Sequence, residues 1–498
     1  MKSIAKYLLA LVAMVCLPLQ AQEVNTLYFL HNAPMRHIIN PAFQPQNNVY
    51  IVLPAIGYTT MSMGNNALTM KDLIFQDPTT GKTITALHPN AEGQLWNKLP
   101  AIMNINTNLQ VNLLSFGAQV AKGKGYFHVN LSERIGLGID LPKSMFGPLL
   151  GQSLNNINLN SLNIGAMMYT EAALGYSHII NEHWTVGAKV KILAGHAYAR
   201  GHFSELGLNS SQESTVLRGN GTIQVAGLVD TQMLQSLLDG TGLPSNYFPD
   251  QVIQNVKPAG YGGALDMGVS YKPFKFMEVN AAVTDLGFIY WQKGGSSIIS
   301  MDTTFNGLGD LKYEDYTDQN GNFQTDAFMS DLTENMGEYL NALHIHNPTN
   351  KPFTNMLTAN LRVGVDFSVW KERIAVGIHS RTQFYNNQQV AEELIVGAAF
   401  RPFKSLNIAA SYSLLNGHLS NFGGALSISP GGGIMLTLAA DYIPTNFAAY
   451  QLEDMEILLP YETGRFNFAM GLAVIIGKRK PKVSNTISGA TSTKPEKE

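Results

Sequence analysis

The sequence predicts an all-β protein, namely a transmembrane antiparallel β-barrel of about 14 strands. Three observations support this prediction: many segments alternate apolar and polar residues, short turns alternate with long connections, and one strand-turn-strand corner occurs twice. The corner reads Gly268-Val-Ser-Tyr-Lys-Pro-Phe-Lys275 and returns as Gly397-Ala-Ala-Phe-Arg-Pro-Phe-Lys404. Alternation with a period of two means that one face of a strand meets apolar surroundings and the other meets polar ones.

The first 21 residues are predicted to be a cleaved signal peptide, which marks the chain for export. Lys2 and Lys6 form its charged start, residues 8–17 its apolar stretch, and Leu19-Gln-Ala21 its cleavage site. The only cysteine, Cys16, lies in this segment, so the mature chain is expected to form no disulfide. Beyond it, no apolar run reaches the roughly 18 residues that a transmembrane helix needs. Any crossing of a membrane is therefore expected to use strands.

The composition favours a large barrel over a soluble enzyme. The sequence has 33 Lys and Arg against 36 Asp and Glu, and without Lys2 and Lys6 the net charge is −5. This mild charge shows no basic stripe, so nucleic acid is not an expected partner. The 46 glycines suit tightly curved strands, and the 20 tyrosines suit membrane interfaces. Residues 49–477 are expected to form one barrel, and residues 478–498, rich in Lys, Ser and Thr, a disordered periplasmic tail.

Residues 127–141 show the alternation most fully. Every second residue from Phe127 to Leu141 is apolar except Glu133, and the residues between them are polar or glycine. The apolar set is expected to face lipid, and the other set is expected to face the interior of the barrel. The same pattern recurs in residues 185–192, 361–369, 406–412, 434–440 and 466–476.

The connections between these strands fall into two classes. Tight corners are predicted at residues 181–183, 272–275, 371–373 and 401–404, and long connections over roughly 198–213, 228–262 and 291–353. Bacterial barrels of this kind have short turns on the periplasmic side and long loops outside. Residues 301–340, with nine acidic residues and one lysine, are therefore predicted to form an external loop.

The polar face of the strands carries charged residues that are predicted to point into the barrel. Two interpretations remain open. The charges either neutralise one another inside a filled barrel, because buried charges must be paired, or they line a selective polar pathway. The residues concerned are Lys189, Lys191, Asp266, Glu278, Arg362, Asp366, His379, Arg381 and Asp441.

Three short motifs resemble ligand sites but lack an essential part of them. Residues 79–83 lack the first glycine of a phosphate-binding loop, and residues 318–322 lack the glycine and glutamate positions of a calcium loop. His344 and His346 have no third metal ligand nearby in the sequence. The G-x-S-x-G and H-E-x-x-H motifs are absent. The sequence therefore predicts no catalytic residue, no cofactor and no metal, and the protein is not expected to be an enzyme.

Three further stretches carry a family resemblance. They are residues 37–45, His-Ile-Ile-Asn-Pro-Ala-Phe-Gln-Pro, residues 283–291, Val-Thr-Asp-Leu-Gly-Phe-Ile-Tyr-Trp, and residues 466–476 followed by Gly-Lys-Arg-Lys. Together they resemble an uncharacterised family of Bacteroidetes outer-membrane barrels, itself similar to long-chain fatty-acid transporters of the FadL type and to PorV-like secretion barrels. The resemblance spans nearly the whole mature chain. One departure is that this chain does not end on a strand-terminal aromatic residue.

In the fatty-acid transporters, an Asn-Pro-Ala element belongs to an N-terminal hatch that plugs the lumen. The match at Asn40, Pro41 and Ala42 implies that residues 22–48 form an N-terminal plug segment. The alternative is that Asn40-Pro41 is only a turn that leads into the first strand.

The resemblance implies a barrel in the cell outer membrane, surrounded by its lipid, that transports a small hydrophobic or amphipathic molecule. The alternative is a non-transporting barrel that serves as a docking or assembly partner for envelope or secretion proteins. A continuous apolar tunnel past the plug segment would favour transport, and a lumen packed shut would favour docking.

Overall fold

The computed structural model describes residues 24–477 except 53–56, 66–67, 77–82, 86–93, 148–149, 151–156, 211–214, 231–232, 234–256, 293–295, 306–323, 325–326, 328–348, 371–372, 385–389, 416–417, 453–454 and 461–463. The predicted signal peptide, the predicted tail 478–498, the calcium-like motif at 318–322, and His344 and His346 lie outside the described residues, as does most of the predicted loop 301–340.

The described chain is dominated by β-strands. The strands are β1 Val49–Val52, β2 Thr59–Asn65, β3 Ile74–Gln76, β4 Thr83–Thr85, β5 Ile102–Val120, β6 Gly125–Pro142, β7 Ile157–Asn158, β8 Asn163–Ile179, β9 Trp184–Ser210, β10 Thr215–Gly227, β11 Gly260–Phe274, β12 Met277–Trp291, β13 Ser296–Phe305, β14 Phe353–Met356, β15 Ala359–Val369, β16 Ile374–Phe384, β17 Val390–Phe403, β18 Leu406–Leu415, β19 His418–Ile428, β20 Ile434–Asp441, β21 Phe447–Leu452, β22 Met455–Pro460 and β23 Arg465–Ile476.

The helices are short. They are the α-helices α2 Met70–Leu73 and α3 Gln94–Lys98, and the 3₁₀ helices η1 Asn25–Phe29, η2 Pro34–Ile38, η4 Ala121–Gly123, η5 Lys143–Phe146 and η9 Pro430–Gly432. Among the described residues, no helix is both long enough and apolar enough to cross a membrane.

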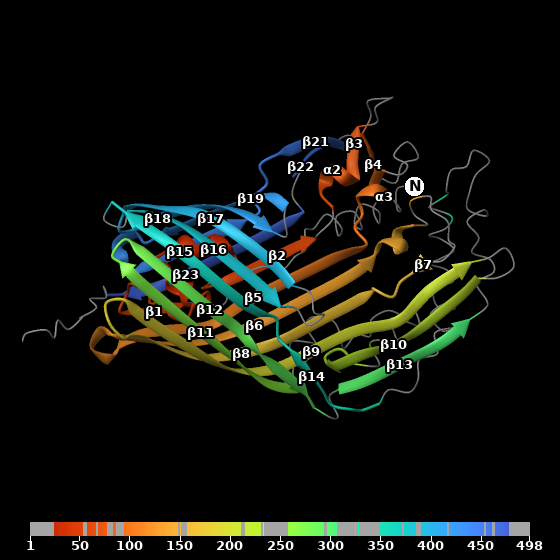
Figure 1. Ribbon diagram of the computed structural model, residues 1–498, viewed down its shortest axis with the longest axis horizontal. Coiled ribbons are helices and arrows are strands. Elements are labelled where there is room, and N and C mark those ends of the chain that lie inside the picture. Colours follow the sequence, from red (N-terminus) through yellow and green to blue (C-terminus); the bar gives the residue numbers. More distant parts are fainter. Residues whose placement is uncertain are drawn as a thin grey trace, which may run out of the picture.

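The strands form a closed antiparallel barrel (Figure 1). Strands β1 and β2 lie end to end and share one position, between β5 on one side and β23 on the other. From there each strand pairs with the next through β6, β8, β9, β11, β12, β15, β16, β17, β18, β19 and β20, and β20 returns to β23. The ring thus has 14 strand positions in the described chain, which confirms the predicted number. Closure leaves the ring itself without an unpaired edge.

Beyond the ring, β9 continues as the base of a smaller sheet. Its first half pairs with β11, and its second half pairs with β10, which in turn pairs with β13. The predictions of long connections between strands over 198–213 and 291–353 are therefore partly wrong, because β9 runs to Ser210 and β13 covers Ser296–Phe305. In residues 198–210, charged and polar residues occupy both even and odd positions. The alternation of apolar and polar residues that marks the strands of the ring is therefore missing there.

The two faces of the ring differ as the alternation predicts. On β15, Val363 and Phe367 are 45% and 44% exposed on the outside, whereas Arg362 and Asp366 are buried on the inside. Neighbouring strands repeat this arrangement, with exposed Val376 and Ile378 on β16 and Leu394, Val396 and Phe400 on β17. An apolar outer surface around a polar interior is the arrangement of a barrel that spans a membrane.

The polar residue that interrupts the apolar face, Glu133, is stabilised by a local hydrogen-bond relay. The hydroxyl of Thr170 on β8 donates to Glu133 Oε2 over 2.6 Å and lies 2.7 Å from His196 Nε2. His196 is the additional residue of a β-bulge, because Met168 pairs with Ala197 and Tyr169 with Gly195. The bulge thus supplies His196 as the second contact of the Thr170 hydroxyl, whose first contact is the carboxylate of Glu133.

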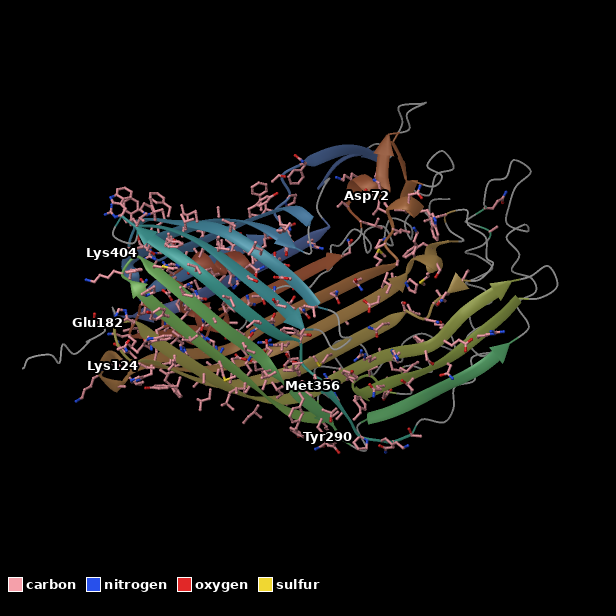
Figure 2. All side chains as sticks on the ribbon, in the orientation of Figure 1. Asp72, Lys124, Glu182, Tyr290, Met356 and Lys404 are labelled. Carbon is pink, nitrogen blue, oxygen red and sulfur yellow. The ribbon has the colours of Figure 1, made fainter. Side chains whose placement is uncertain are left out.

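The two ends of the barrel are different. One end carries short turns, and Figure 2 shows Lys124, Glu182 and Lys404 together at this end. Asp72, in α2, lies at the other end, together with β3, β4, β21 and β22 (Figures 1 and 2). Two of the predicted corners begin later than expected, since β11 continues through Phe274 and β17 through Phe403.

Candidate functional site

The N-terminal segment, residues 24–48, lies inside the barrel from Val24 to Phe43. Its side chains Tyr28, Phe29 and Leu30 are fully buried. Its contacts reach strands around the ring: the Asn25 amide donates to Glu393 on β17 over 2.5 Å, and the Thr26 and Ser411 hydroxyls lie 2.6 Å apart, with Ser411 on β18. Only a position within the ring allows one short segment to contact the inward faces of so many strands.

Asn40 attaches this segment to the wall. Its Oδ1 accepts a hydrogen bond from the backbone N–H of Ala42 over 2.9 Å, which closes a tight turn. Its Nδ2 donates to the carbonyl oxygens of Val269 on β11 and Ala281 on β12, each over 3.3 Å. Gly268 permits this approach, because a β-carbon there would collide with the Asn40 side chain. Asn40 is thus both a turn residue and a wall contact.

Pro41 and Ala42 lie against a second glycine in the wall. A β-carbon at Gly187 on β9 would collide with the Pro41 carbonyl group and the Ala42 nitrogen. The Asn-Pro-Ala element therefore packs onto β9 and β11 through two positions without side chains.

His37 connects the segment to two walls at once. Its Nε2 lies 2.8 Å from the hydroxyl of Tyr50 on β1, and its ring stacks on His128 of β6 at a centroid distance of 4.2 Å. Burial lowers the pKa of His37 well below its usual range, so the imidazole is neutral at physiological pH. Lys189 on β9 donates to the His37 carbonyl oxygen over 3.4 Å and lies 3.6 Å from Asp266 on β11.

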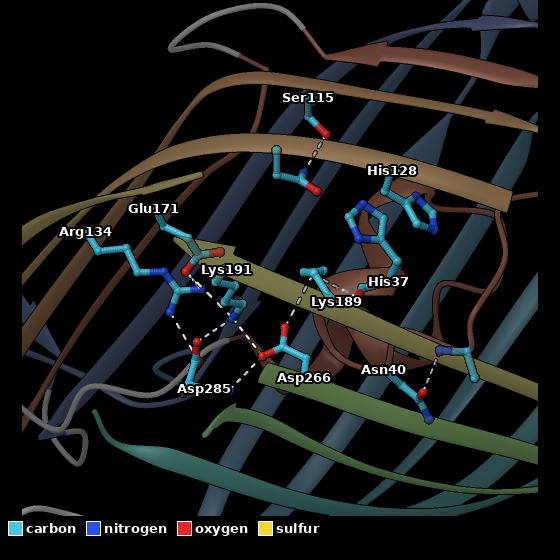
Figure 3. A network of polar contacts seen from close by, with 12 residues as sticks. His37, Asn40, Ser115, His128, Arg134, Glu171, Lys189, Lys191, Asp266 and Asp285 are labelled. Atoms are coloured by element: carbon cyan, nitrogen blue, oxygen red, sulfur yellow. Dashed lines mark hydrogen bonds and ion pairs between the residues drawn. The ribbon is translucent and has the colours of Figure 1, made fainter. Parts of the chain in front are cut away.

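A network of five charged side chains continues from there across the inner wall (Figure 3). Lys191 lies 2.9 Å from Asp266 and 2.5 Å from Asp285. Arg134 on β6 lies 3.0 Å from Glu171 on β8 and 3.2 Å from Asp285 on β12. Figure 3 shows Arg134, Glu171, Lys191 and Asp285 pointing toward one another. With Lys189, three cations therefore meet three anions, and the network is electrically balanced.

Asp285, Arg134 and Glu171 are functional candidates that sequence reasoning missed. Asp285 follows Thr284, and both side chains are buried, so two consecutive residues of β12 point inward. The backbone at Asp285 has a positive φ of 60°, and the pairing with β11 shifts register between Leu265 and Met267. Strict alternation would place Asp285 with the outward Val283. The signal that was available is the Thr-Asp-Leu-Gly sequence, in which aspartate and glycine interrupt an apolar strand.

A second group of predicted residues surrounds Tyr28. The Tyr28 hydroxyl donates to Asp366 Oδ2 over 2.5 Å and accepts from Asn280 Nδ2 over 2.6 Å. The buried ring of His379 stacks on the Tyr28 ring at 4.4 Å. Arg36 of the segment lies over the Phe43 ring, 4.1 Å from its centroid.

The remaining predicted acids lie apart from one another. Asp441 on β20 accepts hydrogen bonds from the backbone N–H groups of Asn25, over 2.5 Å, and Thr26, over 3.2 Å. Glu278 lies near the short-turn end, where it pairs with the exposed Lys272 over 3.2 Å. The structure therefore does not gather the nine predicted residues into one site. It divides them among the charged network, the surroundings of Tyr28, these separate contacts and the neighbouring pair Arg362 and Arg381.

Arg362 and Arg381 face each other in the register of β15 and β16, and both are buried. Arg381 Nε donates to Asn360 Oδ1 over 3.2 Å. The side chain of Arg381 also lines a cavity of about 130 Å³ inside the ring. Its lining comes from two walls: Thr60, Ser62, Asn108, Gln110, Arg134, Met167 and Tyr169 on one, and Asp285, Leu357, Asn360, Arg381 and Gln383 on the other.

The cavity borders an apolar cluster toward the long-connection end. Tyr169 and Leu357 line the cavity and also belong to the cluster, which includes the fully buried Trp291 and Ile289. Trp291 Nε1 donates to Asn355 Oδ1 over 2.6 Å, which satisfies the indole N–H. The cavity thus has hydrogen-bonding walls and one apolar border. Among the described residues, no three His, Cys, Asp or Glu side chains are arranged to hold a metal ion.

Solved structures similar to this chain include a toluene transporter, a FadL homologue and a monoaromatic hydrocarbon channel. The toluene transporter TodX of P. putida has 13% identity and a TM-score of 0.43, with 89% of this chain and 94% of that chain covered. A FadL homologue of Pseudomonas aeruginosa has 9% identity and a TM-score of 0.41, with 92% and 99% covered. The monoaromatic hydrocarbon channel CymD has 10% identity and a TM-score of 0.37, with 90% and 94% covered.

No curated protein matches the chain. A family described as of unknown function, DUF5723, matches residues 41–441, which is most of the sequence. The matched region begins at Pro41 of the N-terminal segment and ends at Asp441 of β20. The chain therefore belongs to the family of unknown function DUF5723.

Proposed function

We propose that the protein is an outer-membrane barrel that transports a small amphipathic molecule. The observation that carries this proposal is the interior cavity, which combines hydrogen-bonding walls with an apolar border. Such a lining suits a molecule with both polar and apolar parts better than a purely hydrophobic one. The apolar belt of the barrel contacts the membrane lipid, and the predicted signal peptide exports the chain.

In this proposal the N-terminal segment acts as a plug. Each of its hydrogen bonds to the strands described above involves at least one side chain, as at Asn25, Thr26, Tyr28 and Asn40. Displacing the segment breaks these contacts but leaves the strand ladder of the ring intact. A hydrogen bond between neutral groups has a net value of only about 0.5–1.5 kcal/mol, and one to a carboxylate about 1.5–3 kcal/mol. A plug held in this way is removable without unfolding the barrel.

A second candidate function is docking or assembly of envelope or secretion proteins, in the manner of the PorV-like barrels that the sequence resembles. The observation that favours it is the close filling of the ring by the segment, whose residues Leu27, Tyr28, Phe29 and Leu30 are at most 1% exposed. A barrel whose plug never leaves would present its outer loops to partners and would move no solute.

A disulfide between the segment and the wall separates the two functions. The hydroxyl oxygens of Thr26 and Ser411 lie 2.6 Å apart, so a Thr26→Cys, Ser411→Cys pair places two sulfurs near the roughly 2.05 Å of a disulfide. The only native cysteine lies in the predicted signal peptide, so this pair is unique in the mature chain. The variant is compared, oxidised and reduced, in planar bilayers, in urea at a concentration that leaves the barrel folded.

The transport proposal expects the reduced variant to conduct ions in urea and the oxidised variant to stay closed. The single variants Thr26→Cys and Ser411→Cys are the matched controls and should behave as the reduced pair. A deletion of residues 23–48 should conduct without urea. If this deletion variant folds and yet stays electrically silent, the plug and the transport function are both wrong, and docking becomes the better candidate.

A further inference from the structure

The charges around the interior cavity do not cancel. Three charged side chains line it, Arg134, Asp285 and Arg381. Arg134 and Asp285 form an ion pair at 3.2 Å and are both engaged in the balanced network described above. Arg381 lies outside that network, so the lining keeps one positive charge.

Among the described residues, no carboxylate lies within ion-pair distance of Arg381. The side chain is only 2% exposed, and within the described part of the chain its hydrogen bond goes to the neutral Asn360 amide, while Nη1 has no partner. Its register partner on β17, Glu393, bonds instead to Asn25 and Tyr442, over 2.5 and 2.7 Å. The other neighbour in register, Arg362, is also a cation. A buried charge without a counter-ion is costly, which makes the site receptive to an anion.

We propose that the cavity binds the anionic part of the cargo, a carboxylate or phosphate group that carries hydroxyl or amide groups, with Arg381 as its counter-ion. This inference rests on the proposed transport function and names the chemical class of the transported molecule. The guanidinium presents several N–H donors to a carboxylate or phosphate.

The other residues that line the cavity favour a ligand whose remaining part, next to the anionic group, is polar. Thr60, Ser62, Asn108 and Gln110 lie on one wall, and Asn360 and Gln383 lie beside Arg381 on the other. Hydroxyl and amide side chains offer both donors and acceptors, so they pair with the hydroxyl or amide groups of a ligand. A plain alkyl chain would leave these groups without partners, and buried polar groups without partners are costly. The apolar part of an amphipathic cargo then packs against the apolar cluster around Trp291.

The test uses the full chain in lipid nanodiscs and measures the shift of its thermal unfolding midpoint with four probes. Glycerate and glycerol phosphate carry the two anionic groups on a hydroxylated body, pentanoate carries a carboxylate on an apolar body, and glycerol is uncharged. We expect shifts from glycerate, glycerol phosphate or both, with the larger shift identifying the preferred anion, and much smaller shifts from pentanoate and glycerol.

Substitutions assign the effect to Arg381. Arg381→Gln should weaken binding of the preferred anion at least about tenfold, and Arg381→Lys should retain part of it. The matched control is Arg218→Gln, which removes the same charge from an exposed position on β10. Should Arg381→Gln fail to fold, Ser62→Ala on the opposite wall should weaken binding of the hydroxylated anion and leave the weak response to pentanoate unchanged.

Three results would overturn the proposal: equal shifts from glycerate and pentanoate, anion binding that survives in Arg381→Gln, or no shift from either hydroxylated anion. These results leave the disulfide experiment untouched, so a barrel that opens in urea without binding anions would be a transporter of uncharged cargo. Conversely, Arg381-dependent binding in a barrel that never conducts would assign the cavity to a binding role and reject transport.

Discussion

At the residue scale, the interior of the barrel is stabilised by charge balance. Each of Arg134 and Lys191 contacts two or more carboxylates, and Asp285 contacts both cations. Moving a charge out of water costs several kcal/mol, so each of these ions depends on its partners. The alternative that the predicted charges neutralise one another applies to the Lys189, Lys191 and Asp266 part of the set. Arg381 behaves differently, because the described residues provide it only with a neutral amide.

The substitution Asp285→Asn tests this balance. It removes one charge from the network and leaves Arg134 and Lys191 insufficiently compensated, so we expect a loss of about 3–5 kcal/mol in the free energy of unfolding. The measurement is equilibrium unfolding by urea in lipid vesicles. Glu205→Gln is the control, because Glu205 and its partner Arg218 are both exposed and such a pair contributes only about 0–1 kcal/mol. Equal effects of the two substitutions would contradict the role assigned to the network.

At the scale of a single strand, alternation decides which residues meet lipid, and a bulge reverses the assignment. On β15 the alternation is uninterrupted, so Val363 and Val369 lie on the same outer face at different depths. On β12 the irregularity at Asp285 moves the outward set from Val283 to Leu286, Phe288 and Tyr290. The bulge at Asp285 therefore turns its carboxylate into the interior. The apolar residues on both sides of the bulge still face outward, as a membrane-facing strand requires.

Arginine substitutions at two depths of β15 test the membrane assignment. Val363→Arg places a charge in the middle of the strand and should cost about 2–4 kcal/mol, whereas Val369→Arg at the short-turn end should cost about 0–1 kcal/mol. Folding efficiency into vesicles, read from the heat-dependent gel mobility of the barrel, measures the difference. If the two variants assemble equally well, the outer face of β15 does not lie in the hydrocarbon layer.

At the scale of the whole molecule, the closed barrel has two ends that carry different elements. The short turns, including the one at Lys404, gather at one end, and α3 with Lys98 belongs to the other end (Figures 1 and 2). Short turns face the periplasm in bacterial outer-membrane barrels. Phe403, which precedes Lys404, is 67% exposed and is placed to anchor that end at the membrane interface.

Thiol labelling on intact cells tests this orientation. Lys98→Cys should react with a reagent that does not cross membranes, because the Lys98 side chain is 51% exposed at the outer end. Lys404→Cys should resist the reagent until the cells are broken open, after which both variants should react. Labelling of the Lys404 variant alone on intact cells would mean that the barrel is inserted the other way round.

By itself, the sequence determined the fold class, the approximate number of strands, the faces of regular strands and the approximate position of the short turns. These features depend on local periodicity and on turn residues, which a single segment displays without its neighbours. The sequence also identified Arg362, Asp366, His379 and Arg381, because β15 and β16 pair without a bulge.

Only the tertiary structure decided which of these residues meet. The inward turn of Asp285 depends on its pairing with β11, and the contacts of the N-terminal segment join residues as distant in the chain as Asn25 and Asp441. The cavity draws its lining from β2, β5, β6 and β8 on one wall and from β12, β15 and β16 on the other, and these strands face each other only after β23 has closed the ring. Periodicity describes each strand alone, whereas a site formed across the lumen depends on how all the strands are joined.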